Sequence, residues 1–170
     1  DYRAALNQWM DANQLRAETA EAAVAGLQEF FKESCRTFLS DTQENALYSP
    51  LNAYIGLALA AELTGGNTRQ QLLDALGSED LPSLRTQTSA LWEAVYKNNG
   101  NEICTLANSL WLDKNLSFDQ TVMDTLGHDY YCSVYQRELD SAGTARDIGA
   151  WLNNNTGGLL KSNTQKIQLP

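Results

Sequence analysis

Apolar residues recur at helical spacing through the first part of the chain. A stripe over residues 27–39 repeats every three or four positions and stops at the polar turn that begins at Ser40. A shorter amphipathic pattern near the N-terminus predicts a separate helix. Its apolar positions are Tyr2, Ala5, Leu6, Trp9 and Met10. We therefore expect residues 1–23 to form an N-terminal amphipathic helical extension and residues 24–170 to form the main, incomplete domain.

The dipeptide Ser49–Pro50 predicts the start of a buried helix. A serine at the N-cap accepts a hydrogen bond from a free backbone N–H, and a proline at the first helical position has no donor to lose. The following segment, as far as Leu63, is apolar almost all round, which is typical of a helix inside a protein larger than a simple bundle. The short apolar run Ala46–Tyr48 comes directly before it.

Glycines and polar caps divide the next segment into two shorter helices. Gly65–Gly66 ends the buried helix, and Thr68 followed by Gln71 fits a capping box that would begin the next one. Gly77 is expected to end that helix. A further helix is predicted over residues 84–95, where apolar residues keep helical spacing.

Two strands alternate with two helices in the second half of the chain. Alternation of period two predicts a largely buried strand at residues 103–112, and a second strand is predicted at 132–139. A capping box at Ser117 and Gln120 begins the helix between them, and a last helix ends at Gly157–Gly158. Two strands cannot cover a core on their own, so we expect the rest of the sheet to lie outside this chain.

Composition narrows the class of protein. The chain has 170 residues, of which 43% are hydrophobic, and a net charge of −9; this is enough apolar content for the core of one domain. The twelve basic residues are spread without a cluster, which argues against a nucleic-acid partner. No apolar stretch approaches the length that spans a bilayer. The sequence begins at Asp1 without the pattern of a leader, so we expect that any leader has been removed.

The residues that could carry chemistry are few and scattered. Cys35, Cys104 and Cys132 form no C-x-x-C pair, so we interpret them as small buried thiols. His128 is the sole histidine and is expected at a solvated helix end. Ser49 has the signature of a cap and lacks the histidine and acid of a nucleophile site. The sequence therefore predicts no catalytic residue, no cofactor and no metal site, and we expect that the chain is not an enzyme.

Three separated segments resemble the serpin family and occur in the family's order. The first is residues 45–52, NALYSPLN, with the GNT turn at residues 66–68. The second, residues 106–112 with the sequence LANSLWL, is similar to the family's ANALW strand. The third, residues 148–152 with the sequence IGAWL, resembles the start of the helix that lies across the main sheet. The resemblance extends from about residue 24 to residue 160 and rests on all three motifs together.

The resemblance implies an α+β fold, namely the helix-rich N-terminal part of a serpin. Helices A–F, strands 1 and 2 of sheet A, and strand 6 of sheet B at Ala46–Tyr48 would all belong to this chain. It also implies that Ser49, Pro50 and Asn52 lie in the shutter region, where sheet A opens. Asn52 departs from the family pattern, which has a second serine there.

Helix F is the second element with a functional role in the resemblance. Ile148, Trp151 and Thr156 match its motif, whereas Gly149 stands where the family has asparagine. A glycine inside a helix costs roughly 0.5–1 kcal/mol relative to alanine. Both departures bear on how readily sheet A would open, and they leave the assignment of the fold unchanged.

The function that the resemblance implies belongs to a longer parent protein. Such a parent would trap serine or cysteine proteases by cleavage of a reactive-centre loop that inserts into sheet A. The present chain lacks that loop and would itself be non-inhibitory. The alternative is a fragment of a non-inhibitory, serpin-like binding or storage protein. The resemblance also implies a secreted, extracellular protein. Because strand 2 would present an unpaired edge, we expect the chain to self-associate or to pair with the missing C-terminal part.

Overall fold

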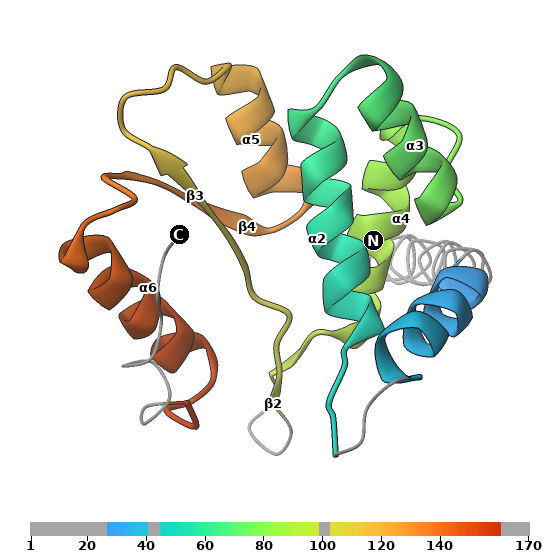
Figure 1. Ribbon diagram of the computed structural model, residues 1–170, viewed down its shortest axis with the longest axis horizontal. Helices are drawn as coiled ribbons and strands as arrows, with labels where there is room; N and C mark the ends of the chain where they lie inside the picture. The colour runs from blue at the N-terminus through green and yellow to red at the C-terminus, as the bar shows by residue number, and fades with distance from the viewer. Residues whose placement is uncertain (1–26, 41–44, 99–102, 161–170) are drawn as a thin grey trace, which may run out of the picture. The chain divides into compact units, whose positions relative to one another are not determined.

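The computed structural model describes residues 27–40, 45–98 and 103–160 (Figure 1). The chain divides into two compact units, residues 1–106 and 107–170, and each is described by itself. The predicted extension at residues 1–23 and the tail after residue 160 lie outside the described residues. No helix within the described ranges is both long enough and apolar enough to cross a bilayer.

The first unit is built around a buried central helix. Residues 27–39 are helical, and they are followed by α2 (Pro50–Leu63), α3 (Gly66–Leu76) and α4 (Leu81–Val95). Helix α2 contacts both α3 and α4. The buried apolar residues of this unit come from all four helices: Leu27, Tyr54, Ile55, Ala58, Leu59, Ala61, Leu73, Leu76, Leu84 and Leu91. The prediction of a buried helix between Pro50 and Leu63 is therefore confirmed.

Helix α3 begins earlier than its predicted capping box. Gly65 is the N-cap and makes no side-chain cap hydrogen bond, and Thr68 lies inside the helix. Gly66 takes a left-handed φ of 55° at the first helical position, a conformation that glycine adopts without the steric cost of a Cβ. The end at Gly77 is as predicted: its φ is 66°, and its N–H points to the carbonyl groups of Leu73 and Asp74.

The predicted strand at Ala46–Tyr48 is wrong for this chain. Residues 45–49 form no regular secondary structure, and the side chain of Leu47 is fully exposed. A strand requires a neighbour for its backbone N–H and C=O groups, and no strand among the described residues pairs with this segment. Tyr48 instead stacks on Phe38, with ring centroids 4.8 Å apart.

The predicted strand at residues 103–112 is divided into two. Strand β2 (Ile103–Cys104) pairs antiparallel with β1 (Lys97–Asn98) in the first unit, whereas β3 (Asn108–Asp113) belongs to the second unit. The backbone between them belongs to no strand. Its carbonyl at Leu106 accepts a hydrogen bond from Trp92 Nε1 at 2.8 Å, so a side chain replaces a sheet neighbour there.

The second unit is a parallel strand pair with two helices. Its elements are β3, α5 (Gln120–Asp129), β4 (Cys132–Arg137) and α6 (Ala142–Asn155). Strands β3 and β4 run parallel, in register from Asn108 opposite Cys132 to Asp113 opposite Arg137. Such a pair needs a crossover connection, and α5 provides it. The two strands that the resemblance assigns to sheet A are therefore neighbours in this chain.

The cap of α5 differs from the prediction. Asp119, not Ser117, is the N-cap, and its carboxylate accepts from Thr121 N at 2.8 Å. After α5 the chain turns sharply at Tyr131, whose φ is 52°. The residues on either side of this turn, Tyr130 and Cys132, are buried together with Leu126. The core of the second unit therefore lies where α5 packs against the start of β4.

Candidate functional site

The residues that the resemblance places in the shutter region, Ser49, Pro50 and Asn52, lie together at the start of α2 in the first unit. Ser49 is the N-cap, and its hydroxyl accepts from Asn52 N at 3.4 Å. Its carbonyl accepts from Ala53 N at 3.1 Å, which is the first hydrogen bond of the helix. Pro50 occupies the first helical position, where a backbone N–H would have no partner within the helix. These contacts are those of a helix cap, as the sequence predicted. Asn52 contributes its backbone N–H to the cap, while its side chain is exposed.

The strand pair of the second unit is reinforced by a ladder of side chains. Trp111 and Tyr135 are register partners, and their rings stack with centroids 4.4 Å apart. Trp111 Nε1 donates to Ser109 Oγ at 2.9 Å, two positions along the same face. The guanidinium of Arg137 lies 5.8 Å from the Tyr135 ring centroid, within the range of a cation–π interaction. Side chains therefore hold β3 and β4 together across one face.

Helix α6 is attached to the end of β4 by polar contacts. Thr144 is buried, and its hydroxyl donates to Glu138 O at 2.7 Å. Arg137 Nε donates to Asp147 Oδ2 at 3.0 Å. Ser141 caps the helix by accepting from Thr144 N at 3.1 Å. The N-terminal half of α6 is thus tied to the strand that precedes it.

The predicted helix F residues all lie on α6 or at its end. Ile148 and Trp151 are half-buried, and Gly149 is buried. Thr156 is the C-cap, with its hydroxyl donating to Leu152 O at 2.8 Å. These residues belong to the second unit, whereas the predicted shutter residues belong to the first. The structure therefore brings together the members of each predicted group within one unit.

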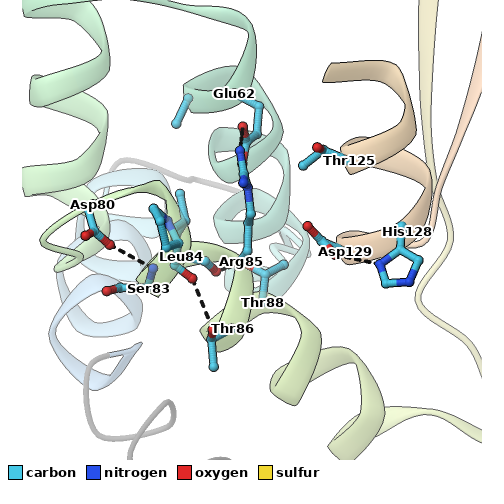
Figure 2. Close-up of polar contacts among 12 residues, drawn as sticks. Glu62, Asp80, Ser83, Leu84, Arg85, Thr86, Thr88, Thr125, His128 and Asp129 are labelled. Atoms are coloured by element: carbon cyan, nitrogen blue, oxygen red, sulfur yellow. Dashed lines mark hydrogen bonds and ion pairs between the residues drawn. The ribbon is translucent and has the colours of Figure 1, made fainter. Parts of the chain in front are cut away.

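A buried ion pair in the first unit was not predicted from the sequence. Figure 2 shows Glu62 of α2 and Arg85 of α4 joined by two hydrogen bonds, Nε to Oε1 at 2.7 Å and Nη2 to Oε2 at 2.9 Å. The side chain of Glu62 is only 2% exposed. The available signal was the single charged residue of a largely apolar helix, because a carboxylate needs a partner when it is buried.

The tyrosine at the centre of the first unit has a strongly perturbed phenol. Tyr54 is buried, and its hydroxyl lies 3.2 Å from both Leu76 O and Gln87 Oε1. Burial raises the pKa of Tyr54 to about 12, since the phenolate would be desolvated. The neutral hydroxyl is therefore a structural hydrogen-bond donor that links α2 to the α3 and α4 segments.

The remaining reactive side chains are dispersed. His128 Nδ1 lies 2.7 Å from Asp129 Oδ1 at the exposed end of α5 (Figure 2). Burial raises the pKa of the Cys132 thiol to about 11, which disfavours the nucleophilic thiolate. Contrary to the prediction that all three thiols are buried, Cys104 is exposed and Cys35 is half-buried. Within the described ranges, no group of three His, Cys, Asp or Glu residues is arranged to hold a metal ion.

Comparison with known proteins identifies the family. The family model described as "Serpin (serine protease inhibitor)" matches residues 26–170. The chain therefore belongs to the serpin family, and its α+β architecture is the N-terminal part of the serpin fold. This confirms the resemblance drawn from the three motifs.

Curated relatives are plant serpins that are much longer than this chain. Serpin-ZX of Arabidopsis thaliana is 26% identical over 121 residues, covering 68% of this chain and 31% of the relative. Serpin-ZXA of Oryza sativa subsp. japonica is 29% identical over 123 residues, covering 69% of this chain and 31% of the relative. The chain thus spans about a third of their length.

Solved serpin structures share the same backbone arrangement. Arabidopsis AtSerpin1 in its native stressed conformation matches with a TM-score of 0.66 and 22% identity, over 85% of this chain and 37% of that one. The thermophilic serpin Tengpin in its latent state matches with a TM-score of 0.64 and 27% identity, over 71% of this chain and 33% of that one. The first of these likenesses, being below 25% identity, supports the fold alone.

Proposed function

We propose that this chain is the N-terminal segment of a serpin-like protease inhibitor. The parent traps serine or cysteine proteases through a reactive-centre loop that is cleaved and then inserts into sheet A as a new strand. The segment supplies strands 1 and 2 of that sheet, helix F and the shutter helix, and by itself it inhibits nothing. The observation that carries the proposal is the parallel β3–β4 ladder, in register over six residue pairs, within a chain matched to the family over residues 26–170.

The geometry of the ladder suits a sheet that must accept further strands. Strand β3 pairs with β4 on one side, and no other strand among those described pairs with it. Its six residues are half-buried rather than exposed. An open edge with apolar side chains favours addition of another chain segment by backbone hydrogen bonds. We therefore propose that this edge pairs with the rest of the sheet in the parent, or with another chain when the segment is alone.

The second candidate function is a non-inhibitory, serpin-like binding or storage protein. It is favoured by the two departures near the opening region, the exposed Asn52 and the buried Gly149 in α6. The two candidates differ in whether the parent's loop can insert after cleavage. Secretion of the parent stays a prediction.

An assay of the full-length gene product separates the two candidates. The parent is incubated with a panel of serine and cysteine proteases, and the mixtures are resolved by SDS electrophoresis. An inhibitory parent forms an SDS-stable complex with at least one active protease. In the first control, the parent is mixed with the same proteases after their nucleophile has been substituted. In the second, the present chain replaces the parent. Neither control is expected to form the complex. If proteases of the panel cleave the parent and none forms a stable complex with it, the inhibitory proposal is contradicted.

A further inference from the structure

Two asparagines of the second unit begin the triplet Asn-x-Ser/Thr, in which the asparagine amide can accept an N-linked oligosaccharide. The first triplet is residues 115–117, with the sequence NLS, and the second is residues 154–156, with the sequence NNT. Neither has a proline at the middle position, which would block the transfer. Because such triplets also occur by chance, the structure around each one decides whether it is a usable acceptor.

The first triplet lies in the connection from β3 to α5, outside both elements (Figure 1). Asn115, Leu116 and Ser117 are all exposed, and Leu116 keeps 58% of its surface accessible. The turn engages Asn115 through its backbone N–H, which donates to Asp113 Oδ1 at 2.8 Å. No hydrogen bond ties the side chain of Asn115 or Ser117 to another described residue. The amide and the hydroxyl of this triplet are therefore both accessible to an enzyme.

Contacts to β4 hold this turn in place without the polar side chains of the triplet. Gln136 Nε2, on β4, donates to Leu116 O at 2.9 Å and to Lys114 O at 3.3 Å. Lys114 N donates to Arg137 O at 2.8 Å. The turn thus presents Asn115 from an anchored backbone, and a glycan attached there would extend into solvent without displacing a packed side chain.

The second triplet lies at the end of a helix and is less suited to modification. Asn154 is in the last turn of α6, and Thr156 is the C-cap. The Thr156 hydroxyl donates to Leu152 O at 2.8 Å, so the group that a transferase must recognise is already engaged. Side chains two positions apart in a helix also do not face each other. A transferase that holds the asparagine and the hydroxyl together would first have to unwind the end of α6.

We propose that Asn115 is an N-glycosylation site and that Asn154 is not. The co-reactant is an oligosaccharide linked through its anomeric carbon to a lipid diphosphate. Asn115 Nδ2 forms a bond to that carbon, the bond from the carbon to the diphosphate oxygen breaks, and the amide gives one proton to a base of the transferase. The lipid diphosphate leaves, and nothing is oxidised or reduced. The proposal goes beyond protease trapping and rests on the predicted secretion of the parent.

Mass spectrometry of peptides from the full-length gene product tests the site. The protein is expressed behind a secretory leader in cultured eukaryotic cells. A glycosidase then removes N-glycans and leaves aspartate at each asparagine that carried one, and an untreated sample shows any aspartate formed by deamidation. Conversion is expected at position 115 in most copies and not at position 154. Absence of conversion at 115, or equal conversion at both positions, would overturn the proposal.

Substitutions of the hydroxyl residues separate a glycan from any other change at the asparagine. Ser117→Ala is expected to abolish conversion at Asn115, and Ser117→Thr, which keeps the hydroxyl, is expected to preserve it. The matched control Thr156→Ala should leave conversion at Asn115 unchanged. Conversion at Asn115 that survives Ser117→Ala would contradict an N-linked glycan.

The same sites can be read when a variant folds poorly and is retained in the cell. Cell-free translation with microsomes exposes the chain to the transferase before secretion, and the same conversion at Asn115 is expected. Parent made in bacteria that lack the transferase carries no such glycan and can still be assayed for protease trapping. The two proposals can therefore fail separately.

Discussion

Glu62 and Arg85 form a two-point ion pair that joins helices α2 and α4 across 23 positions of sequence. Both carboxylate oxygens accept from the guanidinium, and the Glu62 side chain is almost completely excluded from water. A carboxylate in that position depends on its partner, because removal of one member of a buried pair leaves an uncompensated charge. The pair therefore fixes how the two helices pack.

Replacement of Arg85 by alanine is expected to destabilise the first unit. Loss of one member of a fully buried pair costs roughly 3–5 kcal/mol. Because Arg85 is 33% exposed, water screens part of the charge, and we expect Arg85→Ala to lower the free energy of unfolding by about 2 kcal/mol. The control is Arg36→Ala, which breaks the exposed pair with Glu33 and should cost less than about 1 kcal/mol. Urea unfolding measures both; equal losses would contradict the account.

The phenol of Tyr54 predicts a stability loss in alkali. Its pKa is raised to about 12 in the folded chain from 10.0, so its contribution is fully present below pH 10 and is lost as the pH rises from 10 toward 12. Over that window stability should fall by up to about 1.4 kcal/mol per pH unit more in the wild type than in Tyr54→Phe. Thermal or urea unfolding of both proteins across the window measures the difference. Parallel curves would show that this phenol does not carry the effect.

Alanine at two glycines should shift stability in opposite directions. Gly77 ends α3 with a φ of 66°, where a Cβ costs roughly 1–2 kcal/mol, so Gly77→Ala is expected to destabilise the chain by about 1 kcal/mol. Gly127 lies inside α5, and apart from its chain neighbours and the backbone of its own helix no atom lies within 4 Å of the site where a Cβ would be placed. Gly127→Ala should therefore stabilise it by about 0.5–1 kcal/mol. Shifts of the same sign in urea unfolding would refute this interpretation.

The cap at Ser49 is expected to make a modest contribution to stability. Its hydrogen bond to Asn52 N is long, at 3.4 Å, so Ser49→Ala should cost about 0.5–1 kcal/mol, at the low end for an N-cap. Ser49→Asp, which can also cap, should restore most of that loss. If Ser49→Asp is as unstable as Ser49→Ala, the hydroxyl has a role other than capping.

Local signals in the sequence predicted the helices well. Ser49–Pro50 and Gly77 were assigned correctly because a cap or a left-handed end depends on a few neighbouring residues. The same locality explains the wrong starts at Thr68 and Ser117, because the N-cap residues are Gly65 and Asp119, a few positions away.

Features that depend on distant partners were harder to predict. The segment Ala46–Tyr48 has the composition of a strand, but no described strand pairs with it. The strand at residues 103–112 was predicted as one piece, because alternation alone does not show that Trp92 binds the carbonyl of Leu106. The pair of Glu62 with Arg85 was missed for the same reason. The family motifs nevertheless identified the fold. Each motif is typical of one serpin element, and the three motifs occur in the family's order.

We propose that β3 and β4 belong to a sheet that receives the parent's own cleaved loop. The most direct test is calorimetry of the full-length parent before and after a protease cuts that loop once. Insertion of a new strand adds backbone hydrogen bonds and releases strain, so the account predicts a clear rise in Tm after cleavage. An unchanged or lower Tm, with the loop shown by mass spectrometry to be cut, would contradict it.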